Sequence, residues 1–134
     1  MNGRNRWLAA FGYGVLAELA VIATIVLAVM AYKLFAEPTG AEYQAFAERV
    51  GSLVGPIVGT LFVYIFARLL MGRLSTRFVA HGLVVAVVAI ALSIAGSIAG
   101  HGSVPSAYIL ASLLKLAAGA LAGFLAARTA QVNA

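Results

Sequence analysis

The chain has 134 residues, of which 63% are hydrophobic and 10% are charged, and its mean hydropathy is +1.04. This composition excludes a soluble globular domain, a disordered chain and a collagen-like fibre. The sequence contains no cysteine and no aspartate, so we expect neither a disulfide framework nor a metal site, and no cofactor. The net charge of +5 in so apolar a chain indicates membrane topology rather than nucleic-acid binding.

Four stretches of the sequence are long enough to cross a bilayer. About 20 apolar residues, each rising 1.5 Å, span a hydrocarbon core of roughly 30 Å. On this basis we predict spans at residues 7–32, 50–71, 78–99 and 107–127. Because the connecting segments are short, we expect residues 1–134 to form a single domain. The predicted fold is an all-α, polytopic four-transmembrane-helix bundle.

The basic residues at the ends of the spans and beyond them predict the orientation. Short loops rich in Lys and Arg stay on the cytoplasmic side of a membrane. With four spans, both tails and the second connection share one side, and this side carries six of the cations: Arg4, Arg6, Arg68, Arg73, Arg77 and Arg128. We therefore expect a multi-pass protein of a bacterial-type inner membrane with both termini in the cytoplasm.

A helix start is encoded between the first two spans. The sequence Thr39-Gly-Ala-Glu42 fits a capping box, in which the threonine hydroxyl accepts from the third helical N–H and the glutamate reaches back. The second helix is therefore predicted to begin near Gly40, well outside the span 50–71.

Small residues recur along one face of each of the last three spans. Helices in lipid associate through close contact between small residues, and the candidate packing positions are Gly51, Gly55, Gly59, Gly96, Gly100, Gly119 and Gly123. Two interpretations stay open. These faces close the bundle, or one of them, first of all the zipper Gly51-Gly55-Gly59, mediates a homodimer.

Pro56 lies inside the second predicted span. Its ring would clash with the carbonyl of Ser52, and it removes one helical hydrogen bond. The sequence therefore predicts a kink or local unwinding here. Pro56 is a candidate hinge, with an architectural role as the alternative.

Glu18 and Lys115 are ionisable residues in the middle of predicted spans. Glu18 lies about 18 Å inward from Arg6, and Lys115 lies about 20 Å inward from Arg128, so both are expected near the midplane. An isolated charge at that depth is costly. We therefore predict that the two side chains neutralise each other.

Two hydroxyl residues are expected at similar depths. Thr60 and Ser93 can donate to a carboxylate, so the candidate midplane polar cluster is Glu18, Thr60, Ser93 and Lys115. Three interpretations remain open: a structural clamp between helices, a site for a substrate, ion or proton, and a Lys115 side chain that snorkels to the membrane interface.

The stretch Gly14-Val-Leu-Ala-Glu18 resembles the opening of small multidrug resistance transporters. This resemblance implies a dimeric transporter whose membrane-embedded glutamate, here Glu18, binds protons and cationic drugs. The chain departs from that family in carrying Lys115, which would oppose a cationic substrate, and the other three spans match none of its motifs.

The sequence contains no constellation typical of an enzyme. It has no serine in a nucleophile elbow, no paired carboxylates within the spans and no clustered histidines. We expect a non-enzymatic packing or accessory module, which works in the lipid bilayer as part of a membrane assembly or a homo-oligomer. The alternative is a minimal transporter or channel that uses the polar cluster of Glu18 and Lys115.

Overall fold

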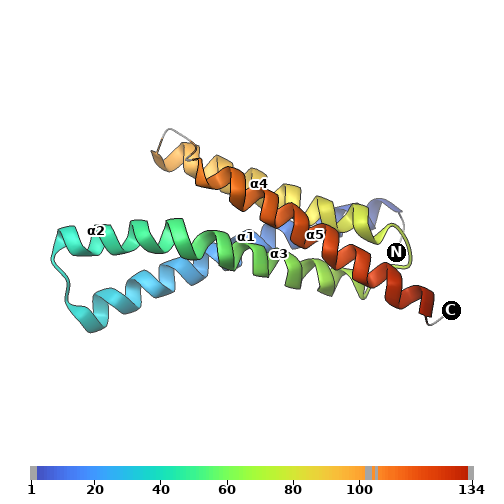
Figure 1. Ribbon diagram of the computed structural model, residues 1–134, viewed down its shortest axis with the longest axis horizontal. Coiled ribbons are helices and arrows are strands. Elements are labelled where there is room, and N and C mark those ends of the chain that lie inside the picture. The colour runs from blue at the N-terminus through green and yellow to red at the C-terminus, as the bar shows by residue number, and fades with distance from the viewer. Residues whose placement is uncertain (1–2, 102–103, 105, 133–134) are drawn as a thin grey trace.

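The computed structural model describes residues 3–101, 104 and 106–132, and these are almost entirely helical (Figure 1). The elements in chain order are α1 (Gly3–Ala36), α2 (Gly40–Arg49), the π-helical turn η1 (Val50–Val54), α3 (Gly55–Met71), α4 (Phe78–His101) and α5 (Ala107–Val132). Because α2, η1 and α3 follow one another without a break, the described ranges contain four helices that are long and apolar enough to cross a membrane. The predicted all-α four-helix fold is confirmed, and no strand occurs in the described ranges.

The first two helices extend beyond the predicted spans. The run Gly40–Met71 has 32 residues and α1 has 34, whereas about 20 residues cross a hydrocarbon core. At their far ends the two helices pack against each other. The rings of Tyr32 and Phe46 stack with centroids 4.0 Å apart, and Lys33 Nζ lies 5.9 Å from the ring centroid of Tyr43.

The turn between α1 and α2 contains the predicted capping box. Glu37 has a φ of 44° and is followed by Pro38, a combination that ends a helix. The carboxylate of Glu42 accepts hydrogen bonds from the backbone N–H and the hydroxyl of Thr39, both at 2.8 Å. These bonds stabilise the ionised carboxylate and so lower the pKa of Glu42. The second helix begins at Gly40 as predicted.

The helices form two hairpins, α1 with the α2–α3 run and α4 with α5 (Figure 1). The hairpins lie against each other at one end of the bundle, which holds the described chain ends and the connection 72–77 and which we call the closed end. They diverge at the other end, which we call the open end. Both α1 and α5 pack against α3 and against α4. The cations of both tails and of this connection therefore gather at the closed end.

The buried core is built largely from alanine. Ala10, Ala17, Ala86, Ala89 and Ala122 are fully buried. Small side chains allow helix backbones to approach closely, which is how helices associate in lipid. Large apolar side chains are instead exposed on the outside, and they include Leu27, Phe35, Ile57 and Ile109. This distribution fits a small multi-pass membrane protein in a lipid bilayer.

Helices α4 and α5 approach each other closely at glycines. A Cβ atom on Gly82 would collide with the carbonyl oxygen of Gly119, and a Cβ on Gly119 would collide with that of Gly82. A Cβ on Gly123 would lie 2.5 Å from the Cα of Val79. Gly119 and Gly123 therefore pack as predicted, against backbone that cannot move aside.

Three of the other candidate packing glycines do not contact another helix. A Cβ atom on Gly51, Gly96 or Gly100 would meet no atom of the described chain within 4 Å. Gly51 and Gly96 are exposed although their neighbours Val50 and Ser97 are buried, so these glycines face away from the core, and the prediction that they close this bundle is wrong. At Gly55 an added Cβ would lie 3.6 Å from Ile25 Cδ1, an ordinary contact. A homodimer through Gly51 and its neighbours stays a prediction.

The helix is distorted just before Pro56, as predicted. Residues Val50–Val54 form a π-helical turn, and the N–H of Gly55 donates to the carbonyl of Val50. Pro56, in the first turn of α3, has no N–H to donate to Ser52, so the widened turn accommodates its ring. The role of Pro56 as a hinge stays a prediction.

Candidate functional site

Glu18 and Lys115 meet in the centre of the bundle. Lys115 Nζ lies 2.7 Å from Glu18 Oε2, and the two residues are only 4% and 7% exposed, respectively. The predicted pairing of the two charges is therefore present. Lys115 does not reach a membrane interface, so the snorkelling interpretation is wrong.

Ser93 completes a closed ring of hydrogen bonds with this pair. Its hydroxyl donates to Glu18 Oε1 at 2.6 Å and accepts from Lys115 Nζ at 2.5 Å. Both oxygens of the carboxylate therefore have a donor within the ring. We call Glu18, Ser93 and Lys115 the polar triad.

Thr60 is not part of this cluster. Its hydroxyl donates to the carbonyl of Pro56 at 2.8 Å, one turn back on the same helix. A threonine hydroxyl in a helix commonly donates to the carbonyl four residues earlier, and Thr24 and Thr129 do the same in this chain. The prediction that Thr60 donates to Glu18 is therefore wrong, although the residue lies at the expected level of α3.

The triad joins three helices and uses space provided by the fourth. Glu18 comes from α1, Ser93 from α4 and Lys115 from α5. Since α1 and α5 each pack mainly against α3 and α4, the two charged side chains reach across the bundle interior. On α3, a Cβ atom at Gly59 would lie 2.8 Å from Lys115 Cε. Because Gly59 has no side chain, the methylene groups of Lys115 fit against α3 at this position. Sequence reasoning missed this role of Gly59.

We predict that Gly59→Ala disturbs the triad, because the added methyl group occupies the place of Lys115 Cε. The free energy of unfolding should fall by about 1–3 kcal/mol, as in other overpacked interiors. Detergent-mediated unfolding followed by circular dichroism measures this change.

The matched control is Gly55→Ala, one turn earlier, where the methyl group makes only an ordinary contact. The loss at Gly59 should also shrink when Lys115 is shortened to alanine, because neighbouring sites couple. An equal effect of both glycine substitutions would contradict the proposed fit of Lys115 against Gly59.

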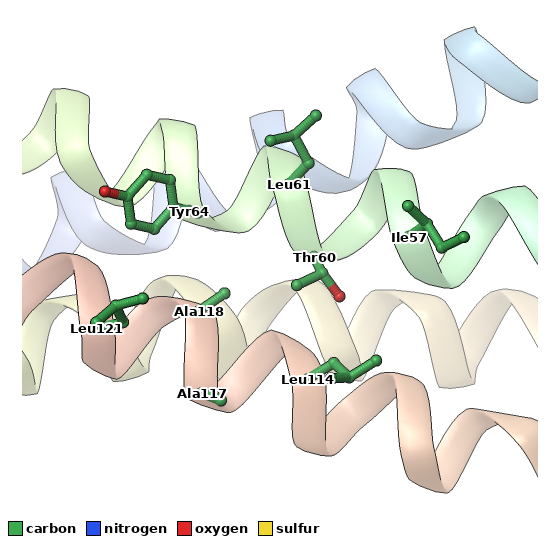
Figure 2. Close-up of a pocket in the computed structure, with 8 residues that line it drawn as sticks. All are labelled: Ile57, Thr60, Leu61, Tyr64, Leu114, Ala117, Ala118 and Leu121. Carbon is green, nitrogen blue, oxygen red and sulfur yellow. The ribbon is translucent and has the colours of Figure 1, made fainter.

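An apolar cavity lies beside the triad rather than around it. It measures about 410 Å³ and opens between α3 and α5. Figure 2 shows Ile57, Leu61 and Tyr64 on one side and Leu114, Ala117 and Leu121 on the other. Its lining contains no charged residue, so the cavity offers no direct approach to Glu18 or Lys115.

Another buried polar residue, His81, lies near the closed end. His81 stacks on Trp7 with ring centroids 4.2 Å apart, and its Nδ1 lies 2.8 Å from the carbonyl of Arg77. Within the part of the chain that the structure describes, its Nε2 has no hydrogen-bond partner. The contacts made by His81 join α1 to the start of α4 and supply packing rather than a cluster of ionisable groups.

Comparisons of the chain with protein-family models, with curated proteins and with solved structures gave no match. The resemblance of residues 14–18 to small multidrug resistance transporters therefore has no support beyond that stretch. The four apolar helices define the class, a small multi-pass membrane protein.

Proposed function

We propose that the protein is a non-enzymatic packing or accessory module of a membrane assembly or a homo-oligomer. The observation that carries this proposal is the polar triad, in which the two charges of the bundle centre lie 2.7 Å apart and bind each other. A buried pair that is satisfied internally specifies how helices fit together. The triad in this proposal holds α1, α4 and α5 in one arrangement.

The burial of the triad favours a structural role over solute binding. Glu18 and Lys115 are almost inaccessible, and each already has the opposite charge as its partner. A solute would have to separate the pair and replace both partners, which leaves a charge uncompensated at an intermediate stage. The apolar lining of the neighbouring cavity supplies no replacement.

The alternative is a minimal transporter or channel, which the mere presence of ionisable residues in the spans favours. Proteoliposomes that contain a pH-sensitive dye test it with protons as the probe, at several pH values. We expect the wild type and Glu18→Gln to leak no faster than protein-free vesicles. A pH-dependent proton flux of the wild type that Glu18→Gln abolishes would replace our proposal with the transporter.

The proposed association uses the small-residue surface at the open end of the bundle. Gly51, Gly96 and Gly100 are exposed there and allow close approach of another helix. Sedimentation in lipid-like micelles should show an oligomer that Gly51→Leu or Gly96→Leu dissociates. A monomer at every protein-to-detergent ratio would contradict the homo-oligomer. The module would then have to associate with a different protein.

We also propose an inner-membrane location with both chain ends in the cytoplasm. The support is the gathering of arginines at the closed end, whereas Glu37, Glu42 and Glu48 lie at the open end. Since the chain has no cysteine, single cysteines at Asn5 and Gln44 can be labelled in intact cells. Only the cysteine at position 44 should react with an impermeant reagent, and the reverse result would invert the orientation.

A further inference from the structure

Two cavities open between the same pair of helices. The first, which we call the tail cavity, is the apolar space of about 410 Å³ between α3 and α5 (Figure 2). The second measures about 270 Å³ and lies at the closed end, where Arg68, Met71, Leu74, Phe78 and Thr129 line it. We call it the head cavity.

The two cavities follow one face of α3. Tyr64 lines the tail cavity and Arg68 lines the head cavity, and they are one helical turn apart. The tail cavity extends along α3 to Ile57, about 16 Å from Arg68 along the helix axis. In Figure 2 the Tyr64 side chain points along α3 toward the end that carries Arg68. The polarity of this face therefore changes from apolar to cationic along the membrane normal.

The head cavity lies in a strongly positive environment. Arg68 is exposed, and among the described residues no side chain pairs with its guanidinium. Arg73, Arg77 and Arg128 lie at the same end, and all four acidic residues of the chain lie elsewhere, with Glu18 paired at the centre and three at the open end. The first N–H groups of α4, which begins at Phe78, add partial positive charge.

We propose that the two cavities bind one anionic phospholipid. Its phosphate lies in the head cavity and accepts from Arg68, whose guanidinium matches phosphate geometry. One acyl chain lies in the tail cavity against Ala117 and Leu121. A zwitterionic lipid fits less well, because its headgroup cation would face arginines with no carboxylate nearby.

Native mass spectrometry of the full chain in neutral detergent tests the proposal. The probes are phosphatidylglycerol and phosphatidylcholine with identical acyl chains. We expect one phosphatidylglycerol to bind about tenfold more tightly than phosphatidylcholine. Arg68→Gln should weaken binding of phosphatidylglycerol about fivefold, the effect of removing one basic residue near an anionic lipid, and Arg68→Lys should restore part of it.

The matched control for charge is Arg128→Gln. Arg128 lies at the same end but sits over the Phe124 ring, 5.1 Å from its centroid, and it does not line the head cavity. Its removal should change the affinity less than twofold. Equal losses for both arginine variants, or equal binding of the two lipids by the wild type, would overturn the proposal.

The tail cavity is tested separately. Ala117→Phe fills it without changing the charge, so it should weaken binding of both lipids several-fold, whereas Ala91→Phe on the exposed surface of α4 should not. Unchanged lipid binding by Ala117→Phe would overturn the acyl-chain site. Displacement of phosphatidylglycerol by millimolar inorganic phosphate would show that the head cavity binds free phosphate, and it would overturn the lipid as ligand.

Discussion

Replacing Glu18 by Gln is expected to lower the free energy of unfolding by about 3–5 kcal/mol, because it leaves the buried Lys115 charge without its partner. Lys115→Met should have a similar effect, since it leaves the carboxylate of Glu18 uncompensated. Both changes keep the side-chain volume close to that of the wild type. The expected losses therefore report charge rather than a cavity. Unfolding in mixed micelles by increasing fractions of anionic detergent measures them.

The double variant Glu18→Gln/Lys115→Met should recover most of the lost stability. With neither charge present, nothing remains to be neutralised, and buried pairs replaced by neutral groups are often as stable as the original. Glu48→Gln, on the exposed surface of α2, is the control for loss of a carboxylate and should have little effect. Additive losses in the double variant would contradict a clamp in which the two charges act as one unit.

Gly82→Ala is expected to separate α4 from α5, because the new methyl group takes the place of the Gly119 carbonyl oxygen. The neighbour is backbone, so it cannot rotate aside as a side chain does. We expect the free energy of unfolding to fall by about 1–3 kcal/mol, the range for overpacked interiors. The same fall is expected for Gly119→Ala. The same detergent-unfolding measurement checks both.

Gly96→Ala is the matched control on the same helix. An added Cβ at Gly96 would meet no described atom within 4 Å, so in the monomeric chain this substitution changes helix propensity but not packing. It should be neutral or slightly stabilising, since alanine favours a helix over glycine by about 1 kcal/mol. If Gly82→Ala behaved like Gly96→Ala, the close contact of α4 with α5 would be contradicted.

Helix number, helix positions and the depth of the charges were accessible from the sequence. A bilayer requires about 20 apolar residues per span, and this single requirement located all four helices. The depths of Glu18 and Lys115 followed from counting residues along helices of known rise. The high cost of an unpaired charge in lipid then predicted their contact, which is found at 2.7 Å.

The sequence did not show which of the two hydroxyls, Ser93 or Thr60, donates to Glu18. Both hydroxyls lie at a similar depth, but depth does not specify the rotation of a helix about its axis. The structure turns Ser93 toward Glu18, whereas Thr60 bonds to its own helix. Helix rotation also decides which of the candidate packing glycines contact another helix. In the zipper Gly51-Gly55-Gly59 only Gly59 faces a tight contact, because Gly51 is turned outward and Gly55 leaves an ordinary distance to Ile25.

For this protein the sequence by itself determined the class of membrane protein, the four helices and the depth of the two charges. Hydropathy and helix rise can be read along a single helix without knowing its neighbours. Only the tertiary structure decided which faces meet, that Ser93 closes the triad, and that Gly82 packs against Gly119 while Gly96 faces away from the other described helices. These outcomes depend on helix rotation and crossing, and they are set by contacts between residues far apart in sequence.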